Sequence, residues 1–151
     1  MSGNRRKIMF RDAMSRWPAG VSVVTVPDGD EFRPATVSSF TSLSVDPPQV
    51  VVSLKSDSRV LELAQASGTF YVSVLADDQQ EISDICASYD SSMLPGPHVP
   101  QSLGIFTCTV VDVLVPSHGT HCVLVGKVDT CAADLGRRPL LYWNRAYRRV
   151  L

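Results

Sequence analysis

Short runs of β-branched and aromatic residues, separated by turn residues, recur along the whole chain and constrain its fold most strongly. Residues 21–26, 50–54 and 70–75 are nearly continuous runs of this kind, which is typical of buried strands. Residues 106–115 and 121–128 are two further runs joined by a short turn, so we expect them to pair as an antiparallel hairpin. The pattern predicts a mainly β protein with six to eight short strands.

Three helical patterns lie among these runs, at residues 8–17, 60–67 and 77–87. In the first, apolar residues recur at helical spacing with charged residues between them, which indicates an amphipathic helix. In the third, we expect Ile82 and Ile85 to face the core. Few helices among many strands favour a small β-barrel with helices at its margins.

The remaining segments are short or irregular. Residues 35–41 are expected to form a strand that returns beside residues 21–26, and residues 140–143 and 147–150 to close the sheet as two short strands. Pro95, Gly96, Pro97 and Pro100 interrupt residues 88–104, so that segment is expected to be irregular.

Length and composition indicate one ordinary globular domain over residues 1–151. The net charge of −1 gives no electrostatic reason to expect binding to nucleic acid or to an anionic membrane. We find neither an apolar leader nor a membrane-spanning run. The four cysteines are widely spaced and contain no C-x-x-C pair, which indicates reduced thiols rather than a disulfide framework. We therefore expect a cytoplasmic protein.

A cluster of hydroxyl side chains stands within the segment ATVSSFTSLSVDPPQVVVSL at residues 35–54. Thr36, Ser38 and Ser39 come directly before Phe40, so small polar groups adjoin apolar surface; we call residues 36–40 the polar ledge. An isoalloxazine ring suits such a place, because its rim carries hydrogen-bonding groups while its faces are aromatic.

A second group of polar residues follows at the start of the helical pattern of residues 60–67. Ser56, Ser58 and Arg59 would offer a phosphate two hydroxyls, a helix N-terminus and a guanidinium together. The alternative is that one serine only caps the helix and that Arg59 is solvated.

These motifs together resemble the flavin reductase domain family, whose members bind FMN or FAD on a split β-barrel. TVSSFTSLSVDPP is the most specific motif; SLKSDSR and FYVSVLADDQ support it. The resemblance implies that the polar ledge lines the flavin ring and that the ribityl chain and phosphate are bound by Ser53, Ser56, Ser58 and Arg59. It also implies a homodimer that oxidises NADH or NADPH and supplies reduced flavin to a separate monooxygenase.

His121 is the candidate catalytic residue. Gly119-Thr120-His121 is similar to the family's Gly-Asp-His segment, in which the histidine faces the nicotinamide, although Thr120 replaces the acidic residue. The alternative is a hairpin histidine with a structural hydrogen bond. A metal site is not expected, because His118, His121 and Cys122 have no fourth ligand at suitable spacing.

Two further alternatives remain open at the level of sequence. Thr120 and the short segment of residues 88–104 also suit a barrel that binds or cyclises a small apolar metabolite through Phe40, Trp143 and Tyr147, without flavin. The terminal segment RRPLLYWNRAYRRV interleaves arginines with aromatic residues. Such a segment can bind nucleotide phosphates and rings, or it can be a strand pair with a solvated charged face.

Overall fold

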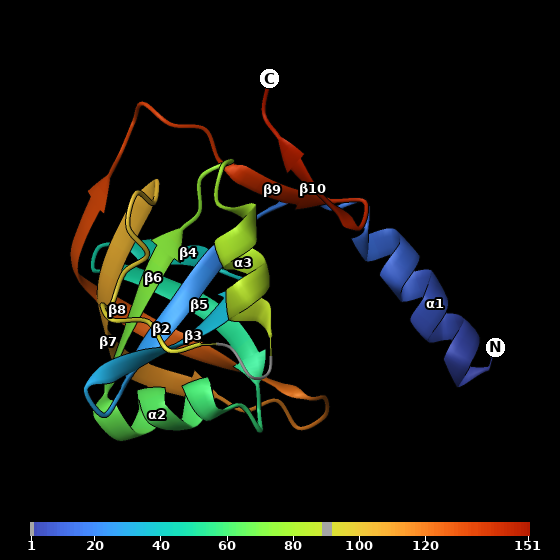
Figure 1. The fold of residues 1–151 in the computed structure, drawn as a ribbon. Helices are drawn as coiled ribbons and strands as arrows, with labels where there is room; N and C mark the ends of the chain where they lie inside the picture. Colours follow the sequence, from blue (N-terminus) through green and yellow to red (C-terminus); the bar gives the residue numbers. More distant parts are fainter. Residues whose placement is uncertain (1, 89–91) are drawn as a thin grey trace.

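The fold is mostly antiparallel β structure, and the computed structural model describes residues 2–88 and 92–151 (Figure 1). One sheet has seven strands in the order β3-β2-β6-β7-β8-β5-β4. Along this sheet they span Glu31–Val37, Ser22–Asp28, Thr69–Val74, Gly104–Leu114, His121–Ala133, Pro48–Lys55 and Thr41–Val45. A second sheet has the order β1-β9-β10, with bounds Ala19–Gly20, Leu140–Trp143 and Ala146–Arg149.

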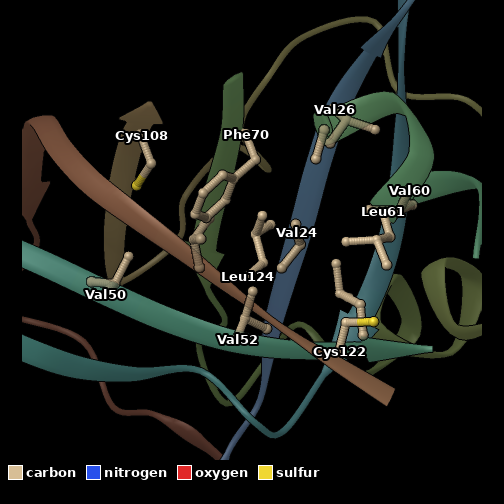
Figure 2. Packing of buried hydrophobic residues seen from close by; sticks show 13 residues of the cluster. Val24, Val26, Val50, Val52, Val60, Leu61, Phe70, Cys108, Cys122 and Leu124 are labelled. Atoms are coloured by element: carbon tan, nitrogen blue, oxygen red, sulfur yellow. The ribbon is translucent and has the colours of Figure 1, made fainter. Parts of the chain in front are cut away.

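The interior of the larger sheet holds the main hydrophobic core (Figure 2). Alternate residues of β5 are buried there, as the two-residue period of a strand requires. The helix α2 (Arg59–Ser67) closes one end of this core with Val60, Leu61 and Ala64. Ser58 caps that helix, and Gly68 ends it with a φ of 72°, a conformation that glycine adopts without strain.

A second, smaller core lies on the outer face of β2, against α3 (Gln80–Ala87). Val23 contributes from β2 and Val21 from the position just before it, and Leu75 and Leu140 contribute from neighbouring segments. Burial raises the pKa of Cys86 in this core to about 11, so its thiol stays protonated at neutral pH. The strand β2 is therefore buried on both faces.

Three polar side chains, those of Thr25, Ser73 and Gln79, hold the irregular segment that follows α3, and the first two are fully buried. Ser73 Oγ accepts a hydrogen bond from Val99 N at 3.0 Å, and Gln79 Nε2 donates to Pro100 O at 2.8 Å. The fully buried Thr25 donates its hydroxyl proton to Pro97 O. These contacts explain how a proline-rich segment without regular structure is ordered over residues 92–103. Residues 89–91 of the segment lie outside the described residues.

The N-terminal helix α1 (Gly3–Met14) projects away from both sheets and buries no residue (Figure 1). Its base is anchored to the turn between β9 and β10. Arg145 pairs with Asp12 at 2.5 Å, Arg16 donates to Asn144 Oδ1 at 3.0 Å, and Trp143 Nε1 donates to Arg16 O. The helix is thus fixed at one end and exposed along its length.

Most of the expected elements are confirmed, including the mainly β class, the hairpin of β7 and β8, and the helix α2. Three expectations were wrong. Residues 35–41 do not form one strand, because β3 ends at Val37 and β4 begins at Thr41. The last two strands pair with β1 in a sheet of their own instead of closing the larger one. Ile85 is 41% exposed, and α3 buries Ser83 and Cys86 instead.

The cysteines occur as free thiols, three of them buried and Cys131 exposed. Burial raises the pKa of Cys108 to about 12, with smaller contributions from Asp129 and Cys131. Within residues 2–88 and 92–151, no helix combines the length and the apolar character needed to cross a membrane.

The close packing of β8 on β6 yields a stability prediction. A Cβ at Gly126 would stand 2.5 Å from Phe70 Cε1, and Phe70 is fully buried, so its ring has no room to move. Gly126→Ala should lower the free energy of unfolding by about 1–3 kcal/mol, the usual cost of overpacking a core. Urea denaturation measures this. Gly20→Ala is the control, because no heavy atom lies within 4 Å of its Cβ position; equal stability of the two variants would contradict the prediction.

Candidate functional site

The polar ledge is a short irregular connection between β3 and β4, fixed to the neighbouring strand by one serine. Ser39 Oγ donates to Ser53 O at 3.0 Å and accepts from Ser53 N at 3.1 Å. One hydroxyl therefore satisfies both backbone groups of Ser53, a residue in the middle of β5. Ser38 is exposed beside it. The ledge thus offers free hydroxyl and backbone groups at a fixed position against β5.

A hydrogen-bond network holds the start of the ledge from behind. Thr36 Oγ1 donates to Ser83 O at 2.7 Å, which ties β3 to α3. The hydroxyl of the fully buried Ser83 lies 2.7 Å from Tyr147 Oη, and Tyr147 also donates to Asp84 Oδ1. Burial raises the pKa of Tyr147, and the hydrogen bond to Asp84 adds to the shift, so the phenol stays protonated. The network links β3, α3 and β10.

The aromatic ring of Phe40 is turned into the protein. It packs against Phe106 with ring centroids 5.2 Å apart and joins the main core. Phe40 therefore anchors the end of the ledge through its partly buried side chain.

The second group of polar residues surrounds the turn of residues 55–59, between β5 and α2. Ser58 Oγ accepts a hydrogen bond from Leu61 N at 3.1 Å, so Ser58 caps the helix. This agrees with the alternative that one of the two serines is a helix cap. Ser56 Oγ lies 3.3 Å from Cys122 Sγ. Arg59 forms an exposed ion pair with Glu62 at 2.8 Å, and such pairs contribute little to stability. The guanidinium can therefore turn to an arriving anion at small cost.

His121 lies at this same turn and not at the ledge. It pairs in register with Lys55 at the end of β5, and Ser56 N donates to Thr120 O at 2.9 Å. Thr120 Oγ1 lies 2.8 Å from His121 Nδ1, a contact that orients the exposed ring. Ser56, Ser58, Arg59 and His121 are thus brought together, whereas the polar ledge lies farther along β5. A catalytic role for His121 stays a prediction.

A cavity of about 690 Å³ opens beside the polar ledge, and the sequence reasoning did not find it. Ser38 and Ser39 line one side. The other walls come from α1, from the segment that follows it, from β9 and from the β9–β10 turn, and include Phe10, Arg11, Trp17, Tyr142, Trp143 and Arg145. The basic and aromatic character of the terminal segment was the available signal, but it did not show which arginines would meet the ledge.

The comparisons with known proteins identify the family. The family model described as flavin reductase like domain matches residues 14–151. The chain belongs to the flavin reductase family. It is 31% identical over 147 residues to the reductase component of 4-hydroxyphenylacetate 3-monooxygenase from Thermus thermophilus, with 96% of this chain and 97% of that protein covered. It is 34% identical over 153 residues to the NADH-dependent FMN reductase AsuE2 of Streptomyces nodosus subsp. asukaensis, covering 91% and 82%.

A solved structure extends the similarity to the whole fold. The NADH:FAD oxidoreductase SgcE6 of Streptomyces globisporus, in complex with NAD and FAD fragments, superposes with a TM-score of 0.87 at 25% identity. All of this chain and 96% of that chain are covered. The split barrel expected of a flavin reductase is thereby confirmed.

The residues present fit a flavin mononucleotide. Ser53 lies on β5 and is bound by the ledge, and Ser56 follows the end of that strand. Three residues separate them, which corresponds to roughly 10 Å of extended chain. A five-carbon ribityl chain with its phosphate ester spans a comparable length. The ring would therefore lie at the polar ledge while the phosphate reaches the hydroxyls and the helix N-terminus at residues 55–59.

The two neighbouring serines of the ledge should differ in their contribution to stability. Ser39→Ala leaves both backbone groups of Ser53 without their partner, so we expect it to lower the free energy of unfolding by about 1–2 kcal/mol. Ser38→Ala removes an exposed hydroxyl and should change that free energy by less than about 0.5 kcal/mol. Chemical denaturation of both variants compares them directly. Equal effects would mean that Ser39 does not fix the ledge to β5.

Proposed function

We propose that the protein is an NAD(P)H:flavin oxidoreductase that reduces FMN or FAD and releases it for a separate monooxygenase. The observation that supports this most is the position beside β5 of the polar ledge and of the turn of residues 55–59, which are separated by roughly the length of a ribityl phosphate. Family membership supports the same activity, since relatives are named as NADH-dependent flavin reductases and as reductase components of monooxygenases.

In this proposal the residues of the chain mainly bind and orient. The polar ledge holds the rim of the ring with hydroxyl and backbone groups, and Ser53 lies beside the ribityl chain. Ser56, Ser58 and Arg59 hold the phosphate. Bound flavin supplies the acceptor for the hydride that leaves the nicotinamide. The protein contributes by placing the two rings face to face, for which no acid–base cluster is needed.

His121 has a supporting role in the same proposal. Its ring, oriented by Thr120, and the ammonium of Lys55 stand on adjacent strands at the phosphate end of the site. From there His121 would meet the phosphate side of either nucleotide. Exposed groups of this kind bind an anion with modest strength, which suits a flavin that must leave after reduction.

Purified protein should oxidise NADH only when FMN or FAD is added or already bound. Because Arg59 is proposed to contact the phosphate, Arg59→Gln should weaken binding of FMN by about three- to tenfold and leave binding of riboflavin unchanged. Steady-state absorbance at the nicotinamide band measures the activity, and flavin fluorescence measures both affinities.

These measurements distinguish a flavin reductase from a barrel that binds or cyclises a small apolar metabolite without flavin. Absence of flavin binding and of flavin-dependent oxidation in the unmodified protein would refute the reductase proposal. Binding of a small apolar molecule, detected by tryptophan fluorescence and unaffected by FMN, would then favour the barrel that acts without flavin. If Arg59→Gln lowered FMN and riboflavin affinity equally, the proposed phosphate contact would be wrong.

We further propose that the protein is a cytoplasmic homodimer in which α1 of each copy packs against the other. The helix buries nothing within its own chain, yet Ile8 and Met9 are about half exposed, at 51% and 50%. The distribution of charged residues also favours a second copy of the chain as the partner. Residues 2–20 and 134–151 hold ten of the 14 basic residues and two acidic ones, whereas the rest of the chain holds four basic and 13 acidic residues. The basic residues 2–20 and 134–151 of one copy and the acidic barrel of the other copy therefore attract one another.

Ile8→Glu should shift the protein from dimer to monomer without unfolding it, since Ile8 makes no buried contact inside the chain. Sedimentation velocity gives the mass, and circular dichroism checks the fold. The control is Asn4→Glu on the same helix, which adds the same charge at a polar position and should leave the mass unchanged. A monomeric unmodified protein, or a dimeric Ile8→Glu variant, would argue against α1 as the contact between the two copies.

A further inference from the structure

Ser83 connects the polar ledge to the C-terminal sheet. It is fully buried on α3, and its two oxygen atoms bind in different directions. The carbonyl oxygen accepts the hydroxyl proton of Thr36 at 2.7 Å, where the ledge begins. The hydroxyl lies 2.7 Å from Tyr147 Oη on β10, 64 residues farther along the chain. The position of Thr36 therefore depends on Ser83, and the position of Ser83 depends on Tyr147.

The protons available in this network fix the direction of its hydrogen bonds. A phenol has one proton, and Tyr147 donates it to Asp84 Oδ1 at 3.1 Å. Tyr147 Oη is therefore the acceptor toward Ser83, whose hydroxyl is the donor. Burial raises the pKa of Tyr147, and the hydrogen bond to Asp84 adds to the shift, so the phenol keeps this proton at neutral pH. The Ser83 hydroxyl thus has a defined acceptor.

The aromatic ring of Tyr147 is held by its own contacts. It packs edge-on against the ring of Tyr142 with centroids 5.5 Å apart, and the two residues are paired in the register of β9 and β10. The ring also packs against the smaller core. These contacts do not need the hydroxyl, so the hydroxyl is a fixed point to which Ser83 binds.

We propose that Tyr147 is a positioning residue for the flavin ring, which acts through Ser83 to hold Thr36 and the start of the polar ledge. The ledge is attached at two points, to β5 by Ser39 and to α3 by Thr36. Without the Tyr147 hydroxyl, the buried hydroxyl of Ser83 must find another acceptor, and this shifts the carbonyl that holds Thr36. The inference rests on the proposed reductase function and adds to it a residue that acts on the ring from behind the ledge.

The first test is the variant Tyr147→Phe, which keeps the ring and removes only the hydroxyl. Riboflavin and FMN share the same ring, so the affinity for both should fall by the same factor, about two- to fivefold. This differs from Arg59→Gln, which should weaken FMN alone. The matched control is Tyr71→Phe, because the ring of Tyr71 packs edge-on against Phe32 and His98 instead of joining the network; it should change neither affinity. Flavin fluorescence measures both affinities.

A second variant tests whether the effect passes through Ser83. Ser83→Ala removes the donor of the same hydrogen bond, so it should weaken both flavins as Tyr147→Phe does. The double variant should bind flavin no more weakly than the weaker single variant, because both changes remove one interaction. The visible circular dichroism of bound FMN should change in both single variants and not in Tyr71→Phe. A residue that only stabilises the fold would leave that spectrum and both affinities as they are.

The outcomes separate this inference from the proposed function. If the unmodified protein binds and reduces flavin but Tyr147→Phe behaves like Tyr71→Phe, or weakens FMN alone, Tyr147 does not position the ring and the reductase function stands. Additive losses in the double variant would mean that Tyr147 does not act through Ser83. If the unmodified protein neither binds nor reduces flavin, both proposals fail together. Far-ultraviolet circular dichroism establishes that each variant is folded under the conditions of the binding measurement.

Discussion

The pairing of β5 with β8 is the constraint on which the rest of the candidate site depends. Residues 49–55 pair in unbroken register with residues 121–127. On one face of β5 this pairing buries Val50, Val52 and Leu54 in the barrel. On the other it fixes Ser53 and the turn of residues 55–59 at a set separation. A slip of one residue would reverse both faces, so the core that stabilises the barrel also enforces the spacing of the site.

The polar ledge depends on contacts from three parts of the chain. Ser39 ties it to β5, Phe40 ties it to the main core, and Thr36 ties it to α3. Behind Thr36, Ser83 continues the connection to Tyr147 on β10. The small C-terminal sheet, which carries part of the cavity wall, is therefore coupled to the ledge through partly buried hydrogen bonds. Such bonds are costly to leave unpaired, which keeps the ledge and the cavity in one fixed relation.

Local patterns predicted much of the fold and part of the site. The run of residues 50–54, the capped helix after Ser58 and the hairpin of β7 and β8 were legible, because alternation, capping and turn chemistry act over a few residues. The prediction for residues 35–41 failed because the chain leaves the strand after Val37, and the hydroxyl of Ser39 binds the backbone of Ser53 on β5 instead. Ile85 was misplaced because Cys86 and Ser83, small enough to approach β2 and β3 closely, occupy the buried side of α3.

By itself, the sequence determined the class of fold, the family and the two polar groups suited to a ring and a phosphate, since each depends on neighbouring residues. Only the tertiary structure decided which residues meet across long stretches of chain. It placed His121 beside Lys55 and Ser56, turned Phe40 into the core, and joined Arg11, Trp17 and Arg145 around a cavity at the ledge. The physical reason is that these contacts are made by packing and hydrogen bonds between segments up to 133 residues apart. No local hydrophobic periodicity or motif spacing in the sequence indicates such contacts.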